Sequence, residues 1–588
     1  MKKRLINSYP KNIVLFLTVI FAINIASITA FAQNNPAGVN LDTVKAQKFD
    51  NGKMWTFEFP PLDYFQETYN FRPAQEWMDN VRLSALRFAD YCSASFVSED
   101  GLVMTNHHCG RDSVTLVQKS GEDFHKDGFI AVTLEDERKI PGLYVDQLVK
   151  IENVTKEIQA ESDKGKTAEE RNELRDKKIA EIEKKLKEQT GFVCQVVSLY
   201  NGGVYSAYLY KRFNDVRLVF APEDQAGFFG GDPDNFTYPR YNLDCTFFRV
   251  YDENGQPLKA KHYYRWSKSG ANPGEPLFVV GNPGSTSRLL TVSQLEYNRD
   301  IDYPYILKYI NKVVDSLKRE ISNNPAKEKD LNDNLFSFTN SQKVYVGIIK
   351  GLNDMVLMAR KKDFEKKFRS AVDAKPELKK KYGDTWSKID ELVQEKRKIA
   401  AQRNSTNGYE IYMKIQELSG QEDYYKQVLG RALYDVYGTS IPPDATFTLR
   451  ISDGVIKSYE YNGTIAPPKT TFYGMYDRYY SFAKQYPWSL NERWINPPAE
   501  FNLETPFNFI STNDIIGGNS GSPIINKDAE IVGLVFDGNI ESMSDEFIYS
   551  SDAPHTVSVD SQGLYEVIKD MYKVTRLAQE IENGKIVK

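Results

Sequence analysis

The chain has 588 residues, which is too long for one ordinary hydrophobic core, so we expect two or more domains. Its composition, 41% hydrophobic and 26% charged, is ordinary for a globular protein, and the net charge of -5 gives no reason to expect nucleic acid as a partner. Only five histidines occur, without an H-E-x-x-H pattern, so a metalloenzyme is poorly supported, and we predict neither a metal nor a cofactor.

The first 32 residues have the pattern of a secretory signal. A basic start at residues 2–4 precedes an apolar run at 13–23, and Ala-Phe-Ala at 30–32 offers a cleavage site. A membrane anchor is the alternative, but Asn24 interrupts the run, which is short for a spanning helix. We therefore predict an exported protein of a Gram-negative bacterium, in the periplasm or at the cell surface, with no membrane span in the mature chain.

A histidine motif follows the first predicted strands. Thr-Asn-His-His-Cys at residues 105–109 comes directly after a short apolar strand and places His108 beside Cys109. We expect His107 to be structural, because side chains alternate along a strand and His107 would point to the opposite face. For His108, the alternative to a catalytic base is a buried histidine whose hydrogen bonds are satisfied.

The remaining elements alternate between β and α patterns. Lys- and Glu-rich sequence over residues 154–190 has helical periodicity and predicts a solvent-exposed helical hairpin between strands. The layout predicts a mixed β and α fold, in which residues 33–291 and 438–588 are β-rich and residues 292–437 form an α-helical cap domain. A chain whose β halves flank a helical block fits a double β-barrel with an inserted cap.

A serine motif lies in the second β-rich half. Gly-Gly-Asn-Ser-Gly-Ser-Pro at residues 517–523 puts Ser520 in a glycine-rich loop before a strand. A serine hydroxyl is a poor nucleophile near neutral pH and needs an adjacent base, for which His108 is the candidate. The glycines allow a tight turn, so we expect the backbone N–H groups of Gly518 and Ser520 to form an oxyanion hole. For this loop alone, a plain glycine-serine turn is the alternative.

A serine–histidine pair also needs a third group that orients the imidazole. The best candidate is Asp244, which starts an apolar strand 136 residues after His108 and 276 residues before Ser520. Asp232 and Asp234 compete for this role, and a structural turn aspartate is the alternative for Asp244.

The four cysteines predict disulfides, because an exported protein with an even cysteine count tends to form them. Three pairings exist. Cys92 and Cys109 flank the strand before His108, 17 residues apart, and their closure would hold the histidine loop. Cys194 and Cys245 are then the residual pair. A zinc site is the alternative, but no C-x-x-C spacing occurs.

Together these segments resemble a known family. The chain resembles the bacterial dipeptidyl-peptidases 7 and 11, which are exported serine exopeptidases with a chymotrypsin-like double barrel and a helical cap. The matching segments, in the family's order, are residues 54–57, 105–109, 230–240, 280–288, 517–523 and 536–539. The resemblance implies that His108, Asp244 and Ser520 are a catalytic triad and that the chain cleaves dipeptides from free peptide N-termini.

The resemblance also implies how the peptide's α-amine is held. Asn235, Phe236 and Arg240 match the family's amine-recognition segment, and Asp537 matches its amine-binding carboxylate. The family takes a further asparagine from its helical cap, for which Asn340 is our candidate. A turn aspartate before a glycine is the alternative for Asp537.

Gly538 bears on specificity. Family members that prefer acidic side chains before the scissile bond carry an arginine at this position, so the glycine implies a hydrophobic or broad preference there, at the position called P1. The interval between Asp244 and Ser520 is shorter than in the family by well over a hundred residues, which indicates a trimmed cap. Phe236 stands where some relatives carry tryptophan, which keeps an apolar wall and loses an indole donor.

The leading hypothesis is an exported serine dipeptidyl aminopeptidase that works through an acyl-enzyme on peptides with a free N-terminus. A trypsin-like endopeptidase with an opened cleft is one alternative, and a catalytically idle binding relative that keeps the fold is another. Because the family's members are often dimers, the resemblance adds a homodimer to the expected partners.

Overall fold

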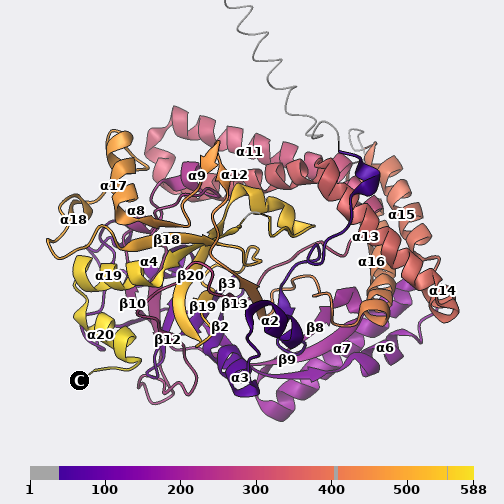
Figure 1. The fold of residues 1–588 in the computed structure, drawn as a ribbon, viewed down its shortest axis with the longest axis horizontal. Coiled ribbons are helices and arrows are strands. Elements are labelled where there is room, and N and C mark those ends of the chain that lie inside the picture. Colours follow the sequence, from indigo (N-terminus) through magenta and orange to yellow (C-terminus); the bar gives the residue numbers. More distant parts are fainter. Residues whose placement is uncertain (1–38, 403–407, 553, 588) are drawn as a thin grey trace, which may run out of the picture.

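The structure, a computed structural model, describes residues 39–402, 408–552 and 554–587. The predicted signal segment at residues 1–32 lies outside the described residues. In Figure 1 the strands gather at the left and centre, and the helices of residues 292–437 extend across the top and the right. Among the described helices, none combines the length and apolar character needed to cross a membrane.

One sheet has ten strands, and residues 85–250 supply all of them. Their order is β5-β10-β11-β4-β3-β2-β7-β9-β8, and β6 pairs with β10. The bounds are β2 (Ala85–Phe88), β3 (Cys92–Phe96), β4 (Leu102–Thr105), β5 (Phe129–Ile130), β6 (Arg138–Lys139), β7 (Val145–Asn153), β8 (Val193–Leu199), β9 (Val204–Phe213), β10 (Val216–Ala221) and β11 (Thr246–Val250).

Successive side chains along these strands pack alternately into two separate hydrophobic cores. Phe247 of β11 packs into the largest hydrophobic cluster, whereas its neighbour Phe248 packs into a second cluster. Met104 and Val103 of the neighbouring strand β4 divide in the same way. Because successive side chains point to opposite faces, a continuous apolar run indicates a strand that is buried on both sides.

The second sheet has nine strands, in the order β1-β14-β13-β19-β20-β21-β18-β17, with β12 paired to β20. The bounds are β1 (Trp55–Thr56), β12 (Arg265–Trp266), β13 (Leu277–Gly281), β14 (Arg450–Gly454), β17 (Lys469–Thr471), β18 (Pro506–Ser511), β19 (Pro523–Ile525), β20 (Glu530–Gly538) and β21 (Thr556–Asp560). Strands β13 and β14 are adjacent and antiparallel, with Leu277 opposite Gly454. The helices between them are therefore an excursion from two neighbouring strands.

This excursion is a block of seven α-helices within the described residues. They are α10 (Val292–Tyr297), α11 (Tyr303–Asn323), α12 (Glu328–Leu352), α13 (Met355–Asp373), α14 (Pro376–Tyr382), α15 (Thr385–Ala400) and α16 (Gly408–Tyr437). In α15 the buried side chains include Trp386, Ile389, Val393 and Ala400. Spacings of three, four and seven residues put them on one face of the helix, which explains how an otherwise charged segment folds.

Helix α12 packs closely on the short helix η5 (Ile540–Glu546) of the second β-rich half. A side chain at Gly347 would collide with Met543, and one at Gly351 would lie 3.0 Å from Ser544. The two glycines lie one turn apart and let the backbones approach. This contact places the helical block beside the segment that follows β20.

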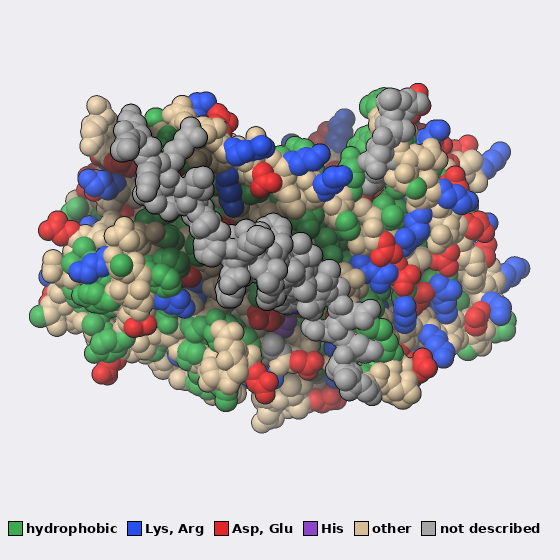
Figure 2. Space-filling model, turned by 90° about the horizontal axis from the view of Figure 1, so that it is seen from above, with side chains coloured by type: hydrophobic (Ala, Val, Ile, Leu, Met, Phe, Trp, Pro, Cys, Tyr) green, Lys and Arg blue, Asp and Glu red, His purple; other side chains and the backbone are tan. Residues whose placement is uncertain are grey.

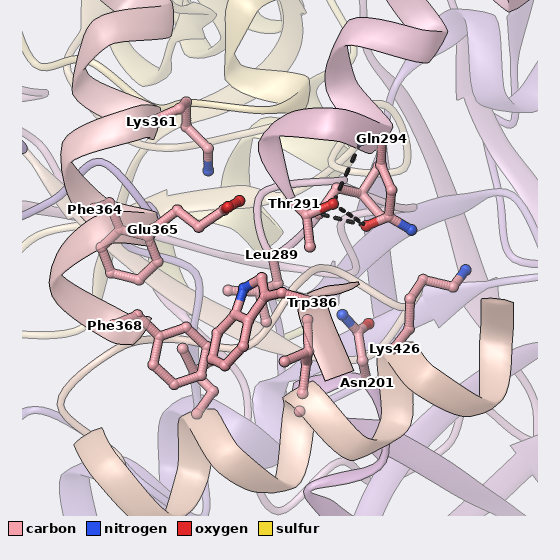
Figure 3. Close-up of a pocket in the computed structure, with 14 residues that line it drawn as sticks. Asn201, Leu289, Thr291, Gln294, Lys361, Phe364, Glu365, Phe368, Trp386 and Lys426 are labelled. Carbon is pink, nitrogen blue, oxygen red and sulfur yellow. Dashed lines mark hydrogen bonds between the residues drawn. The ribbon is translucent and has the colours of Figure 1, made fainter. Parts of the chain in front are cut away.

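Polar side chains around a small cavity also anchor the block. The cavity has a volume of about 30 Å³ and lies between α10, α13, α15 and α16 (Figure 3). Lys361 and Glu365 of α13 point into it. Lys361 donates to the carbonyl of Arg288 at 2.5 Å, and burial lowers the pKa of this lysine to about 8. Glu365 accepts from the N–H of Val292 at 2.7 Å. Polar contacts thus tie α13 to the chain that leaves β13.

The other α-helices lie outside the block. They are α2 (Leu62–Tyr69), α3 (Gln75–Ser84), α4 (His107–Thr115), α5 (Phe124–Asp127), α6 (Thr155–Ser162), α7 (Ala168–Thr190), α8 (Asp224–Gly227), α9 (Gly231–Asp234), α17 (Phe472–Ser481), α18 (Glu492–Ile495), α19 (Ser561–Glu566) and α20 (Thr575–Asn583). The surface in Figure 2 mixes acidic and basic side chains over its right-hand end, in keeping with the small net charge.

The predicted mixture of β and α structure is confirmed. The two predicted β-barrels are not confirmed, because the strand pairs of the described residues form two open sheets. No pair joins β5 to β8 or β1 to β17 in this part of the chain.

Candidate active site

His108 and Asp244 are brought together by two neighbouring strands. Strand β4 ends just before His108, and β11 begins just after Asp244, with Thr105 opposite Thr246. The His108 ring nitrogen Nδ1 lies 2.7 Å from Asp244 Oδ2, and the backbone N–H of His108 donates to Oδ1 at 3.0 Å. The side chain of Asn106 donates to the Asp244 carbonyl at 2.9 Å, which fixes the start of α4 against β11.

The two groups shift each other's protonation. Burial alone would lower the pKa of the His108 imidazole, but the nearby Asp244 carboxylate outweighs it, so this pKa lies above its usual value. Burial alone would raise the pKa of Asp244, yet His108 keeps it below its usual value. The Asp244 side chain is 5% exposed, whereas that of His108 is 43% exposed. An ionised, buried carboxylate therefore holds an imidazole whose other edge is accessible.

Ser520 lies in a tight loop where the two sheets meet. The backbone N–H of Ser93, in β3 of the ten-stranded sheet, donates to the carbonyl of Ser520 at 2.8 Å. Gly518 has a φ of 99°, and a Cβ there would lie 2.5 Å from the Asn282 carbonyl. Gly521 has a φ of 82°, and its Cβ would lie 2.1 Å from the Ser93 carbonyl. Both glycines are needed for the backbone path and for the close approach.

The backbone N–H groups of this loop differ in whether they have an acceptor. The N–H groups of Asn519 and Gly521 donate to the carbonyls of Ile516 and Val535. For the N–H groups of Gly518 and Ser520, the described residues supply no acceptor. Two such donors near one serine hydroxyl are what a developing oxyanion requires.

A cavity of about 1130 Å³ contains His108, Asp244 and Ser520 in its lining. Across the described residues, His108 and Ser520 face this same cavity without a direct hydrogen bond between them. In an unliganded site, such catalytic bonds are often long and tighten only when substrate binds. The structure thus brings the predicted triad to one cavity, with the histidine–aspartate pair already formed.

The predicted amine-binding residues line the same cavity. Asp537, at the end of β20, accepts from Arg240 at 2.5 Å and from the backbone N–H of Phe236 at 3.0 Å. Phe236 has a φ of 61°, an uncommon conformation for a bulky residue, and the bond to Asp537 holds it there. Asn235 donates to Asn340 of α12 at 2.9 Å. The asparagine proposed from the helical block therefore reaches the site.

Gly538 opens one wall of the cavity. A Cβ at this position would lie 2.7 Å from Ser542 Oγ, so Gly538 gives access to the η5 segment. Ser542, Met543 and Glu546 of η5 all line the cavity, and no sequence motif marks them. Seven residues of 3₁₀ helix are too short to produce a periodic signal, although a repeat of three places Met543 and Glu546 on one side.

His107 corrects one expectation. It begins helix α4 instead of lying in a strand, so the alternation argument for its orientation was wrong. It is buried, with Nε2 3.2 Å from Asp224 Oδ1, and Asp224 also bonds Arg111 and His125. Burial alone would raise the pKa of Asp224, but these partners hold it well below its usual value.

The cysteine predictions divide. Cys92 and Cys109 form the predicted disulfide, which closes the loop before His108. The predicted Cys194–Cys245 bond was wrong, because both thiols are free. Cys194 lies in β8 and Cys245 directly precedes β11, and five other strands lie between β8 and β11 in the sheet order. Within the described chain, Cys92, Cys109 and His108 are a compact group of metal-ligand types, but the disulfide leaves no thiolate for an ion.

The chain is similar to known peptidases. A family model described as Peptidase S46 matches residues 49–413 and 405–583. Dipeptidyl-peptidase 7 of Capnocytophaga gingivalis is 24% identical, over 82% of this chain and 88% of its own length. That alignment spans 638 positions, more than this chain has residues, so the relative carries segments that are missing here.

Two further proteins are similar to the chain in sequence or in fold. The Asp/Glu-specific dipeptidyl-peptidase of the same organism is 30% identical, over 54% of this chain and 46% of its own length. The crystal structure of Porphyromonas endodontalis DPP11 covers 90% of this chain and 99% of its own, with a TM-score of 0.77 and 19% identity. The predicted resemblance and the prediction of a peptidase are confirmed, and the chain belongs to the peptidase S46 family.

Proposed function

We propose that this chain is an exported serine dipeptidyl aminopeptidase, which removes dipeptides from peptides with a free N-terminus. The observation that carries the proposal is the presence of Asp537 in the same cavity as Ser520 and the His108–Asp244 pair. An ammonium group needs a carboxylate and carbonyl acceptors, and a fixed distance from that group to the nucleophile sets the dipeptide register. The curated relatives named dipeptidyl-peptidase support the same activity.

In the first chemical step, Ser520 Oγ forms a bond to the second peptide carbonyl carbon while His108 Nε2 takes the hydroxyl proton. The Gly518 and Ser520 N–H groups stabilise the carbonyl oxygen as it becomes an oxyanion. His108 then gives its proton to the leaving amine as the peptide bond breaks. Water repeats the sequence on the acyl-enzyme, which releases the dipeptide acid and restores Ser520. Asp244 orients His108 throughout.

The α-amine end of the substrate would bind at Asp537. One carboxyl oxygen of Asp537 already accepts from Arg240 and Phe236, and the other accepts from the N–H of Gly538 at 2.8 Å. The Asn235 and Asn340 amides supply further acceptors near this carboxylate. Arg240 holds the carboxylate in place for an incoming ammonium.

At P1 we propose a hydrophobic or broad preference that excludes acidic side chains. Relatives with both types of name occur, so the local chemistry has to decide. Three basic side chains line the described part of the cavity, and none is a free partner for a buried carboxylate. Arg111 and Arg240 are in ion pairs, and Lys318 is exposed.

Several coarser features belong to the same proposal. The two sheets would be the two barrels of a chymotrypsin-like fold, with domain limits at residues 33–291, 292–437 and 438–588, and a homodimer is the expected assembly. Export to the periplasm or the cell surface rests on the signal pattern at residues 1–32. The endopeptidase alternative is favoured only by the missing segments, which would open the cleft if they belong to the cap.

Matched fluorogenic dipeptides, with free or acetylated amines and Leu, Phe, Asp or Lys at P1, test the proposal. Cleavage of only the free-amine substrates, with Leu and Phe well above Asp, supports it if Ser520→Ala abolishes the activity. Equal cleavage of acetylated substrates would establish the endopeptidase. Absence of any cleavage, with no labelling of Ser520 by a covalent serine probe, would establish the idle relative.

A further inference from the structure

Glu546 is a half-buried acidic side chain in the wall of the active-site cavity that has no cationic partner among the described residues. The other acids in this part of the lining differ from it. Ion pairs join Asp537 to Arg240, Asp244 to His108, Asp224 and Asp333 to Arg111, and Asp232 to Lys343. Glu328 is exposed to solvent. Glu546 therefore lacks both a counter-charge and full hydration.

Its position is fixed on both its backbone and its side chain. The Ser287 hydroxyl donates to Glu546 Oε1 at 2.8 Å, and the Ser287 backbone N–H donates to the Glu546 carbonyl at 2.7 Å. The second carboxyl oxygen, Oε2, has no hydrogen-bond donor among the described residues. A carboxylate held in this way can accept a bond from a ligand without first reorganising.

The basic side chain whose charge acts on Glu546, Arg288, is already engaged by other acceptors. Arg288 forms a two-pronged ion pair with Asp514, at 2.6 and 2.8 Å, and its Nε donates to the Asp545 carbonyl at 2.7 Å. Asp444, whose charge also acts on Glu546, accepts from the N–H of Arg288. The charges around Glu546 thus leave its own negative charge without a direct partner.

The wall that carries Glu546 adjoins the oxyanion loop. Residues 515–517 lead directly into Gly518, and the Gly517 carbonyl accepts from the N–H of Gly284 at 2.6 Å. Ser287, which holds Glu546, lies three residues after Gly284. A P1 side chain projects from the residue whose carbonyl sits at the oxyanion loop, so it meets this wall. Gly538 has no side chain of its own and lies against Ser542, and both line the cavity together with Glu546.

We propose that Glu546 makes the P1 pocket accept basic side chains, lysine above all, alongside apolar ones. The proposal rests on the proposed function and adds a substrate class to it. The methylene stem of a lysine would lie along Ile515, Ile516 and Met543, and its ammonium would reach the free oxygen of Glu546. A glutamate at P1 would meet Glu546 as a like charge and be rejected.

Protonation of Glu546 gives this preference a pH dependence. Burial raises the pKa of Glu546 to about 7; the bond from Ser287 opposes this shift, Asp444 adds to it and Arg288 reduces it. Tyr303 and Tyr345, on α11 and α12, also face this carboxyl, and their own pKa values are raised. The carboxyl is therefore neutral below neutral pH and charged above it, so the preference for lysine over leucine should increase as pH rises.

The test compares kcat/KM for free-amine dipeptide substrates with Lys, Leu or Glu at P1, and with Lys at the preceding position, P2. In wild type, Lys at P1 should be cleaved at a rate comparable to Leu and far above Glu. Glu546→Gln should lower kcat/KM for Lys at P1 by about 10- to 100-fold and leave Leu nearly unchanged. Glu541→Gln, in the same short helix but exposed, should leave both unchanged.

The ratio of kcat/KM for Lys to that for Leu should rise between about pH 6 and 8 in wild type and stay flat in Glu546→Gln. Taking this ratio cancels the titration of His108, which affects both substrates. An unchanged ratio in Glu546→Gln, or a loss confined to Lys at P2, would overturn the inference while cleavage of Leu substrates kept the proposed function. Absence of cleavage even for Leu would overturn the proposed function and this inference together.

Discussion

Asp244 binds His108 through both of its carboxyl oxygens. One oxygen accepts from the ring nitrogen Nδ1 at 2.7 Å, and the other accepts from the backbone N–H of the same residue at 3.0 Å. The ring is therefore fixed relative to its own backbone, and the proton on Nδ1 is assigned by an acceptor-only partner. This leaves Nε2 as the basic nitrogen on the side of the cavity.

Asp244→Asn should lower kcat by about 10³- to 10⁴-fold with a small effect on KM, because the amide can stabilise the wrong tautomer and no longer balances the imidazolium. Steady-state kinetics on a free-amine Leu substrate measures it. Asp232→Asn is the matched control, since Asp232 also lines the cavity but pairs with Lys343. A larger loss in Asp232→Asn than in Asp244→Asn would reverse the assignment of the third catalytic group.

The same pair sets the pH profile. A general base acts when deprotonated, so kcat/KM should fall as pH drops through the pKa of His108. Because Asp244 raises that pKa, the acid limb for a Leu substrate should lie above the ordinary histidine value of about 6.5. In Asp244→Asn the limb should move to lower pH, since burial then acts without the carboxylate. An acid limb at the same pH in both proteins would show that another group titrates.

The sequence predicted the catalytic residues of this site better than the residues that line the rest of the cavity. His108, Asp244 and Ser520 lie in short motifs whose residue types imply a chemistry, and Asn340 could be proposed from the resemblance. Glu546 could not, because its importance comes from a lack of partners, which only the packing of Ser287 and Arg288 around it reveals.

The wrong predictions concern features that depend on the three-dimensional arrangement of the strands and helices. Cys194 and Cys245 were joined by elimination, a rule that counts thiols and ignores the order of strands in the sheet. His107 was placed on a strand because an apolar run precedes it, but β4 ends at Thr105 and a helix begins two residues later. The mixed β and α composition followed from periodicity, whereas the closure of each sheet depends on strand pairs that periodicity does not specify.

Asp537→Asn should remove most of the discrimination between free and acetylated substrates. The amide keeps an acceptor for Arg240 and the Phe236 N–H, but it loses the charge that attracts an ammonium. We expect kcat/KM for the free-amine substrate to fall by about 100-fold or more, with little change for the acetylated one. Asp333→Asn, another acid of the cavity lining, is the control. Retained discrimination in Asp537→Asn would place amine recognition elsewhere.

Gly517 and Gly518 offer a paired test of the oxyanion loop. Gly518 has a φ of 99°, and a Cβ there would lie 2.5 Å from the Asn282 carbonyl, whereas a Cβ at Gly517 meets nothing within 4 Å. Gly518→Ala should therefore rotate the peptide group and move its N–H away from the oxyanion, which lowers kcat by about 100-fold or more. Gly517→Ala should stay within a few-fold of wild type. Labelling of Ser520 by a covalent serine probe would follow the same order, because that reaction also builds charge on an oxygen beside the loop. Equal activity of the two variants would mean that the Gly518 N–H is not an oxyanion donor and that the Ser520 N–H acts with a different partner.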